Sequence, residues 1–167
     1  MATNIFLTFE GEEDLKGDST DEAHKDYIEV LGWSHSFNQP TSPVRSAAGS
    51  GTIERANHSD ITFTKYTDKS TPGLLKGCWS GKHFTKVIIK QYRAGGIGEV
   101  VDFMNIELTD VIIANFSISA GAGDLPVENV SLAYGKVTYT YGPSDHATGK
   151  KAGAKPVIHD LKTNVIS

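Results

Sequence analysis

Short runs rich in β-branched and aromatic residues, separated by Gly, Pro, Asn, Asp and Ser, recur along almost the whole chain. Asp60–Lys65 alternates apolar and threonine side chains, which is the period of a half-buried strand. Runs of this kind restrict the chain to a mainly β fold. The strands that we predict are Ile5–Phe9, Tyr27–Phe37, Asp60–Lys65, Lys86–Tyr92, Val100–Leu108, Val111–Ser119, Val130–Tyr141 and Val157–Val165.

Two breaks between these runs predict hairpin turns. Arg93–Gly98 is rich in glycine and tolerates the positive φ of a tight turn. Thr109 and Asp110 separate two apolar runs and predict a second turn. Ala120–Asp124 is expected to form a further loop.

One segment, Ser70–Gly81, predicts a short helix instead of a strand. Ser70 or Thr71 is the expected N-cap, and Pro72 follows where its missing N–H does no harm. Gly81 is a natural C-terminal residue for the helix. The residues expected on its buried face are Leu74, Leu75, Cys78 and Trp79.

The segment Asn38–Asn57 predicts a long loop, which is unusual inside a compact domain. Its prolines and charged residues are Pro40, Pro43, Arg45, Glu54 and Arg55. Two interpretations remain open at this point. The loop is either an arm that docks on a neighbouring subunit or a merely mobile connection.

Length and composition predict one globular domain covering residues 1–167, with 38% hydrophobic and 22% charged residues. The net charge of −4 offers no basic face for nucleic acid. No apolar run is long enough for a signal peptide or a membrane helix, so we expect neither. Cys78 is the only cysteine and cannot form a disulfide within the chain.

Charge is unevenly distributed along the chain. Residues 1–30 contain nine acidic and two basic residues, whereas residues 136–167 contain five basic and two acidic ones. The two regions are either separate solvated surfaces or complementary faces that meet between subunits.

No catalytic, cofactor-binding or metal-binding motif is recognisable. Gly142–Lys151 lacks the spacing of a P-loop, and the chain contains no G-x-S-x-G. No two of the six histidines have metal-ligand spacing, so each is expected on the surface or in a strand; for His24, a bond to the turn beside Asp21 is an equal alternative. We therefore predict that the protein is not an enzyme and binds no cofactor or metal.

Several motifs match one known family in order. His24–Ser34 has the pattern H-x-x-x-I-x-V-x-x-W-S, and Asp60–Leu75 runs through F-T-K and D-x-S-T-P into the predicted helix. Further matches are Gly81–His83, Tyr92–Gly96, Ile106–Val111 and Val127–Leu132. Together these segments resemble the haemolysin-coregulated protein (Hcp) family, the tube subunits of bacterial type VI secretion systems.

The resemblance implies a two-sheet β-barrel of the phage tail-tube type, with one short helix and a long extended loop that reaches the adjacent ring. It implies homohexameric rings that stack into a hollow tube and hold small effector proteins in the lumen. The implied partners are other copies of the chain, a spike protein of the VgrG type and a contractile sheath. The tube would be assembled in the bacterial cytoplasm and then secreted through the apparatus.

Alternation along Tyr27–Phe37 adds a hypothesis about the lumen. The bulky residues at odd positions, from Tyr27 to Phe37, are predicted to lie in the core. Ser34 and Ser36 lie on the other face. They either face the channel, where small polar side chains leave room for cargo, or belong to a solvent-facing strand end.

Two other functions stay open. One is a monomeric β-sandwich that binds a carbohydrate or another small ligand. The other is an effector enzyme that shares the barrel. A single monomeric species in solution would favour the first, and an activity that depends on one or two polar residues would favour the second.

Overall fold

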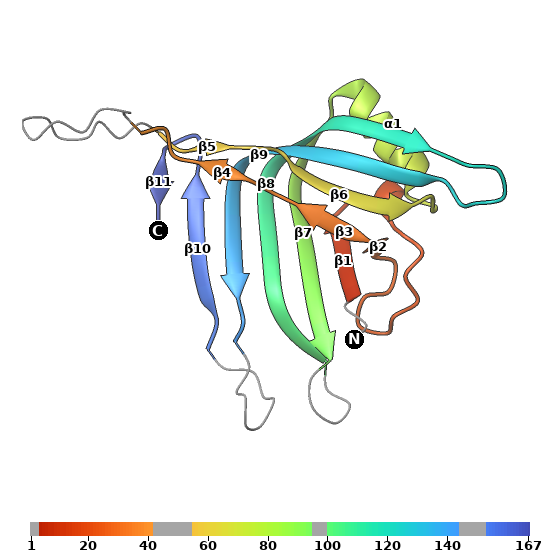
Figure 1. The fold of residues 1–167 in the computed structure, drawn as a ribbon, viewed down its shortest axis with the longest axis horizontal. Coiled ribbons are helices and arrows are strands. Elements are labelled where there is room, and N and C mark those ends of the chain that lie inside the picture. Colours follow the sequence, from red (N-terminus) through yellow and green to blue (C-terminus); the bar gives the residue numbers. More distant parts are fainter. Residues whose placement is uncertain (1–3, 42–54, 95–99, 144–152) are drawn as a thin grey trace, which may run out of the picture.

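The computed structural model describes residues 4–41, 55–94, 100–143 and 153–167. Its elements are β1 (Asn4–Phe9), the 3₁₀ turn η1 (Glu13–Leu15), β2 (Ile28–Val30), β3 (Gly32–Ser34), β4 (Phe37–Asn38), β5 (Asn57–His58), β6 (Ile61–Tyr66), α1 (Thr71–Ser80), β7 (His83–Ala94), β8 (Val100–Ser119), β9 (Val127–Tyr141), β10 (Lys155–Asp160) and β11 (Val165–Ile166). The predicted class, mainly β with one short helix, is confirmed (Figure 1).

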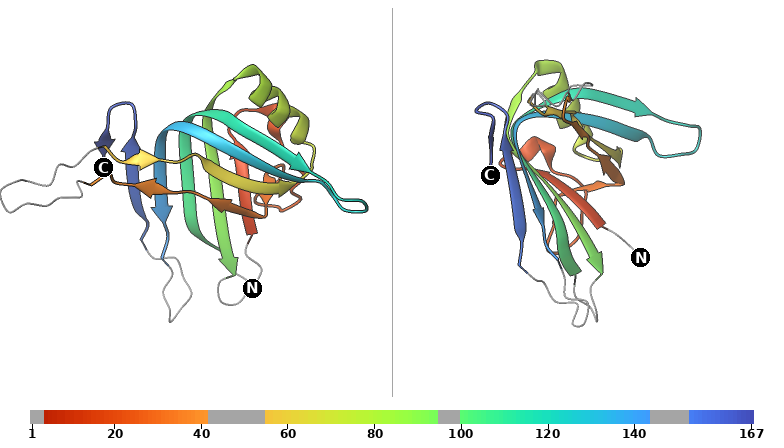
Figure 2. Two further views of the ribbon diagram at one scale, coloured as in Figure 1. Left: turned by 45° about the horizontal axis from the view of Figure 1, so that its top comes forward. Right: turned by 60° about the vertical axis from the view of Figure 1, so that its left-hand side comes forward.

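The strands form a two-layered barrel because some of them serve both layers. The first layer has the order β11-β10-β9-β8-β7-β1-β2, and in the second layer β6 pairs with β3 and β9. β2 and β3 are consecutive, so one segment pairs with β1 in the first layer and with β6 in the second. Figure 2 shows the long strands β8 and β9 turning from one layer into the other. The predicted two-sheet barrel is confirmed.

The core lies between the two layers and is made of aliphatic and aromatic side chains. Burial of each contributes about 1.5–3 kcal/mol. Fully buried members are Leu7, Ile28, Ile61, Phe63, Ile106, Leu108, Val130 and Leu132. The helix α1 contributes Leu74, which is also fully buried, and packs against β8.

The predicted turn at Thr109 and Asp110 is wrong, since β8 runs unbroken through both residues. Thr109 pairs with Lys136 and Val111 with Tyr134, so the ladder to β9 continues on both sides. Asp110 has a φ of 56°, in the left-handed region that aspartate tolerates better than most residues. Asp110 and the register shift between Ile113 and Asn115 both lie in the stretch where the strand passes from one layer into the other.

The hairpin predicted at Arg93–Gly98 agrees with the structure. β7 and β8 are antiparallel up to the pair Ala94 and Val100, and residues 95–99 lie outside the described part. The loop predicted at Ala120–Asp124 also joins two antiparallel strands, β8 and β9. At the C-terminus, β10 and β11 form a small hairpin at the place where we predicted one edge strand.

The helix begins after Ser70, as predicted, and ends at Gly81, which has a φ of 63°. Its expected buried face is wrong at one residue, because Trp79 is 80% exposed. Gly77 is buried in place of Trp79, and a Cβ at this position would lie 2.8 Å from Cζ of Phe84. The helix therefore approaches the barrel through a glycine.

The strand predicted at Tyr27–Phe37 is divided, and its expected core face is wrong in β2 but right at Trp33. In β2 the buried residues are Ile28 and Val30, whereas Leu31 is exposed. In β3 it is Trp33 that packs against the core. The alternation thus shifts by one residue at Leu31, where the chain passes from one layer to the other.

Candidate functional site

Ser34 and Ser36, the predicted lumen residues, lie in different settings. Ser34 is exposed on the outer face of the second layer, paired with Thr62 of β6. Ser36 is also exposed, but its hydroxyl donates to Oγ of Ser59 at 2.9 Å. Ser59 in turn donates its N–H to the carbonyl of Ser36 at 3.0 Å. Ser36 therefore belongs to the base of the long loop.

The outer face around Ser34 is uncharged and made of small polar side chains. Thr62 and Ser131 hydrogen-bond at 2.9 Å, and Thr64 donates to Asn129 at 2.7 Å. Asn115 and Ser117 of β8 pair with Ser131 and Asn129 and extend the surface by one strand. We call this surface the neutral face: Ser34, Thr62, Thr64, Asn115, Ser117, Asn129 and Ser131.

Sequence reasoning found only Ser34 of the neutral face. The period-two spacing of Thr62 with Thr64, and of Asn129 with Ser131, was a usable signal. The outer face of the first layer differs, since it carries Lys86, which pairs with Glu107 at 3.2 Å. The two faces of the barrel therefore have different chemistry.

The long loop starts and ends at a short antiparallel pair. β4 and β5 pair through Phe37 with His58 and Asn38 with Asn57. Of the predicted loop residues, Pro40 is half-buried and Arg55 is exposed. Pro43, Arg45 and Glu54 lie outside the described residues.

Three histidines and two tyrosines gather beneath this pair. Nε2 of His58 lies 2.8 Å from Nδ1 of His159, which belongs to β10. Nδ1 of His58 lies 2.7 Å from the hydroxyl oxygen of Tyr134. His35 bonds the hydroxyls of Tyr134 and Tyr139. We call this cluster the histidine network: His35, His58, Tyr134, Tyr139, His159 and Asn164, which bonds His159 at 3.1 Å.

The surroundings of the histidine network disfavour charge. Burial lowers the pKa of His35 from 6.5 to about 4. The pKa of His58 is lowered by burial and then by the neighbouring His159. Burial also raises the pKa of Tyr134, and that of Tyr139 to about 12. The rings of His35 and His58 and the hydroxyls of both tyrosines are therefore neutral at pH 7.

An apolar patch lies next to the histidine network. Phe37 contacts the ring of Tyr139, to which Val157 is paired, and Ile166 is paired with His159. Phe37 and Val157 are about half exposed, and Ile166 is 67% exposed. We call Phe37, Val157 and Ile166 the loop-side patch. It lies where the first layer extends past the second, at the end of the molecule that carries β10 and β11 (Figure 1).

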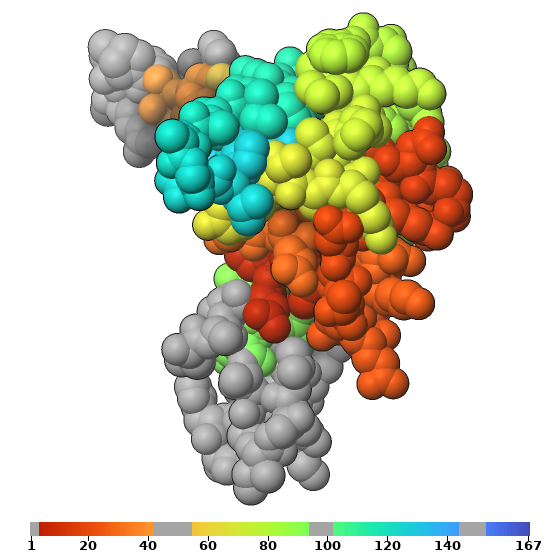
Figure 3. Space-filling model, turned by 90° about the vertical axis from the view of Figure 1, so that its right-hand side faces the viewer, coloured from red at the N-terminus to blue at the C-terminus, as the bar shows by residue number. Residues whose placement is uncertain are grey.

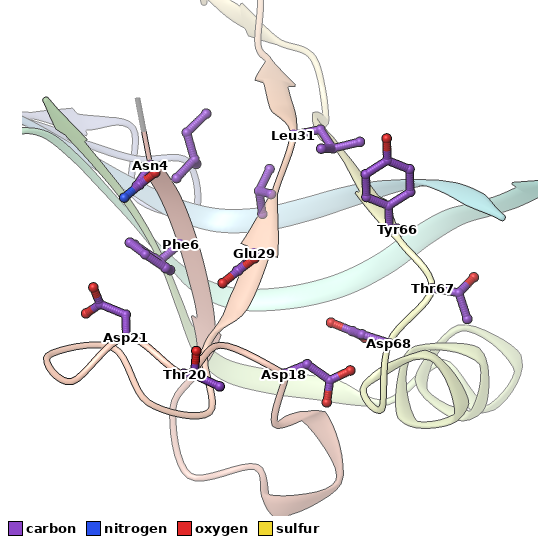
Figure 4. A pocket seen from close by; sticks show the side chains of 12 residues that line it. Asn4, Phe6, Asp18, Thr20, Asp21, Glu29, Leu31, Tyr66, Thr67 and Asp68 are labelled. Atoms are coloured by element: carbon purple, nitrogen blue, oxygen red, sulfur yellow. The ribbon is translucent and has the colours of Figure 1, made fainter. Parts of the chain in front are cut away.

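A cleft of about 550 Å³ lies toward the other end, bounded by β1, β2, the segment after η1 and the end of β6 (Figure 4). Its charged lining residues are all acidic: Asp18, Asp21, Glu29 and Asp68. Apolar side chains stand beside them. Leu31 and Tyr66 line the cleft and are about half exposed, and Leu125 is exposed nearby, next to Pro126, which accepts the N–H of Thr67.

We call Leu31, Tyr66 and Leu125 the cleft-side patch. Figure 3 shows this end of the molecule, where the N-terminal segment, β6, α1 and the β8–β9 hairpin share one surface. Three of the four cleft carboxylates, Asp18, Asp21 and Glu29, come from the acidic N-terminal region of the sequence. The cleft is acidic, whereas Arg55 and Lys155 are exposed beside β5 and β10 at the loop end.

A buried ion network lies behind the cleft. Lys65 is fully buried and pairs with Asp68 at 3.0 Å and with Glu128, which is fully buried too. Lys65 also donates to the hydroxyl of Thr71 at 3.3 Å. The amide of Ser70 donates to Asp68 at 2.9 Å. The F-T-K and D-x-S-T-P motifs are thus two halves of one structural network that joins β6, β9 and α1.

His24, from the other sequence motif, is structural as well. Its ring bonds Asp21 at 2.9 Å, as expected, and the hydroxyl of Tyr92 at 2.7 Å. It also stacks on Phe6, with ring centroids 4.5 Å apart. These contacts hold the acidic N-terminal segment against the barrel and so shape the cleft.

Within the described residues, no group of three or more His, Cys, Asp or Glu side chains is arranged to hold a metal ion. The described helix is too short to cross a membrane. Cys78 is half-buried and packs against the core.

Comparison with known proteins agrees with this picture. Residues 6–141 match the family model described as type VI secretion system effector, Hcp. Protein hcp1 of Pseudomonas aeruginosa is 34% identical over 99% of both chains. The major exported protein of the same species is 32% identical over 77% of both.

Solved structures show the same likeness. One described as a type six secretion system protein superposes with a TM-score of 0.88 at 26% identity, over 99% of this chain and 100% of the other. Hcp1 from Salmonella typhimurium gives a TM-score of 0.78 at 27% identity, over 100% of both chains.

Proposed function

This chain belongs to the Hcp family of the type VI secretion system, and on that premise we propose that its copies close into hexameric rings that stack into a hollow tube. The family predicted from the sequence is confirmed. The protein is a secreted tube protein of this system, and it has a structural role and not an enzymatic one.

Two unlike apolar patches at opposite ends support the ring most directly. The loop-side patch and the cleft-side patch share no residues, so contact between them is heterologous. A heterologous contact builds a closed ring when the rotation between successive subunits divides a full turn. Each subunit would then cover its neighbour's loop-side patch with its own cleft-side patch.

The charges at the two ends support the same contact. The cleft carries Asp18, Asp21 and Glu29, and the loop end carries exposed Arg55 and Lys155. Opposite potentials speed encounter and exclude the wrong register. Two cleft ends would repel each other.

The remaining roles extend the proposal to the assembled apparatus. The long loop, with Pro40, Pro43, Arg45, Glu54 and Arg55, would reach the adjacent ring from its base at β4 and β5. The chain would work as one domain, residues 1–167. The tube would assemble in the bacterial cytoplasm, end in a VgrG-type spike, lie inside a contractile sheath and carry small effector proteins outward.

Native mass measurement with negative-stain imaging tests the ring. We expect a species of about 108 kDa, six times the 18.0 kDa of one chain, that images as a ring with a central channel. The rival hypothesis, a monomeric β-sandwich that binds a carbohydrate or small ligand, predicts 18.0 kDa at every concentration. A strict monomer at high concentration would count against our proposal.

We further propose that the neutral face, including Ser34, lines the channel. Its side chains are small and uncharged, so they leave room for cargo and do not bind charged proteins indiscriminately. Ser36 joins the loop base instead and makes a weaker candidate for cargo contact. The charged outer face of the first layer suits contacts outside the tube.

Replacing Ser34 by tryptophan should weaken the binding of effector to the ring by roughly tenfold or more, because a large side chain would fill space that the cargo needs. Ser34 is exposed, so folding and ring mass should not change. Co-purification of tagged effector with ring measures the loss. The matched control is Ser80→Trp, at the exposed end of α1. If Ser34→Trp retained every effector as well as this control does, the channel assignment would be wrong.

A further inference from the structure

Each hydrogen bond of the histidine network has one possible donor and one possible acceptor when the rings are neutral. The carbonyl of Ser59 can only accept, so Nε2 of His35, 3.1 Å away, carries the proton. Oδ1 of Asn164 can only accept as well, so Nε2 of His159 carries one. Nδ1 of a neutral His159 must then accept the bond from Nε2 of His58.

The donor and the acceptor of each remaining hydrogen bond in the network follow in the same way. Nε2 of His58 is a donor, so Nδ1 of a neutral His58 accepts from the hydroxyl of Tyr134. The oxygen of Tyr134 accepts from Nε2 of His35 at 2.7 Å, so the single N–H there is shared between Tyr134 and the carbonyl of Ser59. Nδ1 of His35 accepts from the hydroxyl of Tyr139. Every bond is satisfied when all three histidines are neutral.

A proton added to any of the three rings breaks this pattern. A charged His159 carries a proton on Nδ1, which then faces the proton on Nε2 of His58. A charged His58 takes away the acceptor of the Tyr134 hydroxyl. A charged His35 does the same to Tyr139. Since the rings of His58 and His159 have centroids 4.7 Å apart, two charges there would also repel.

We propose that the histidine network is a pH-sensitive latch that fixes the base of the long loop when its rings are neutral and releases it on acidification. Its members come from five places in the fold: the β3–β4 link, β5, β9, β10 and the turn before β11. Release would free β4 and β5 from β9 and β10.

The charged groups around the latch act in both directions. Asp60 favours a charged His35, and Arg55 disfavours a charged His58. Burial exceeds these effects, because it is the largest cause of the lowered pKa at both rings. The unfolded reference pKa of histidine is 6.5, and that of His35 in the fold is about 4. The latch should therefore weaken as the pH falls from about 6.5 to about 4.

One consequence of the latch rests on the proposed function, the stacking of rings into a tube. If the loop docks on the next ring, a free loop base would loosen stacking between rings before it affected the rings themselves. Acidification would then convert tubes into separate rings.

Hydrogen exchange at the loop base tests the latch without reference to tubes. The amides to follow are those of Ser36 and Ser59, which bond across the base. After correction for the intrinsic rate at each pH, we expect their protection to fall at least tenfold between pH 7 and pH 4.5. Protection in β7 should stay constant. Equal protection of Ser36 and Ser59 at both pH values would overturn the proposal.

Two variants and a control test whether the pH dependence of amide protection comes from the histidine network. His58→Gln should show low protection at both pH values, with no pH dependence left, whereas His83→Gln should behave as the native chain. His83 is exposed, pairs with Asp110 and lies outside the latch. Tyr134→Phe removes one bond that keeps His58 neutral, so it should move the release upward by up to about one pH unit. A Tyr134→Phe midpoint unchanged from the native chain would refute the latch.

Imaging of tubes at pH 7 and pH 4.5 addresses stacking separately. A base that opens while tubes persist would leave the latch intact and refute its link to stacking. A base that stays closed while tubes fall apart would refute the latch and leave the tube proposal standing.

Discussion

Replacing Lys65 by methionine is expected to destabilise the fold by about 3–5 kcal/mol, more than any other single change that we predict. Lys65 is the cation for two carboxylates, fully buried Glu128 and largely buried Asp68. Methionine fills a similar volume but leaves both charges without their partner. Uncompensated charges inside a barrel cost far more than the ion pair itself contributes. Chemical denaturation followed by tryptophan fluorescence or circular dichroism measures the loss.

Two further variants separate the buried network from a general charge effect. Lys69→Met removes an ion pair with Asp26 that is exposed on both sides, so it should change stability little. The double variant Lys65→Met with Glu128→Leu removes the fully buried anion together with its cation, and should recover a large part of the lost stability. If Lys65→Met were no worse than Lys69→Met, the network would not be what holds β6, β9 and α1 together.

This network also explains why the family could be recognised from the sequence. Its residues fall close together in the chain, from Lys65 through Asp68 to Thr71, because one strand end, one turn and one helix start supply most of it. A local motif of this kind is visible without a structure. The motif identifies the fold, however, and says nothing of which surface meets which partner.

The strands themselves were predictable wherever one face is buried and the other is not. β6 shows this clearly, with buried Ile61 and Phe63 beside partly exposed Thr62 and Thr64. The pattern failed where a strand passes between layers. At Leu31 the chain changes its neighbours without ending, and at Asp110 β8 continues between the same two strands. A period-two pattern cannot distinguish either place from a turn.

Sequence reasoning missed the histidine network altogether. His58 and His159 are 101 residues apart, and each looks isolated in the sequence. Trp79 was misplaced for a related reason, since only the packed structure shows that Gly77 provides the close approach to the barrel. Contacts between strands that are far apart in the sequence depend on the order of the strands in the sheet, and the spacing of residues within one segment does not show that order.

Replacing Ile166 by aspartate is expected to convert the ring into monomers at micromolar concentration. Ile166 is 67% exposed, so the change should leave the fold intact. It would place a negative charge in the loop-side patch, opposite a cleft that carries Asp18, Asp21 and Glu29. A loss of about 2–4 kcal/mol at each contact lowers affinity roughly hundredfold, and a ring repeats this loss at every contact. Thr85→Asp is the control, at an exposed position of β7 that belongs to neither patch, and should still form rings.

The direction of the contact can be tested with a second monomeric variant. Tyr66→Asp damages the cleft-side patch and leaves the loop-side patch intact, the reverse of Ile166→Asp. In a heterologous ring, a mixture of the two retains one sound contact, between the intact loop-side patch of one and the intact cleft-side patch of the other. The mixture should therefore form dimers of about 36 kDa, twice the 18.0 kDa chain, while each variant alone stays monomeric. If each patch paired with itself instead, each variant alone would dimerise, so the distribution of masses decides how the subunits join.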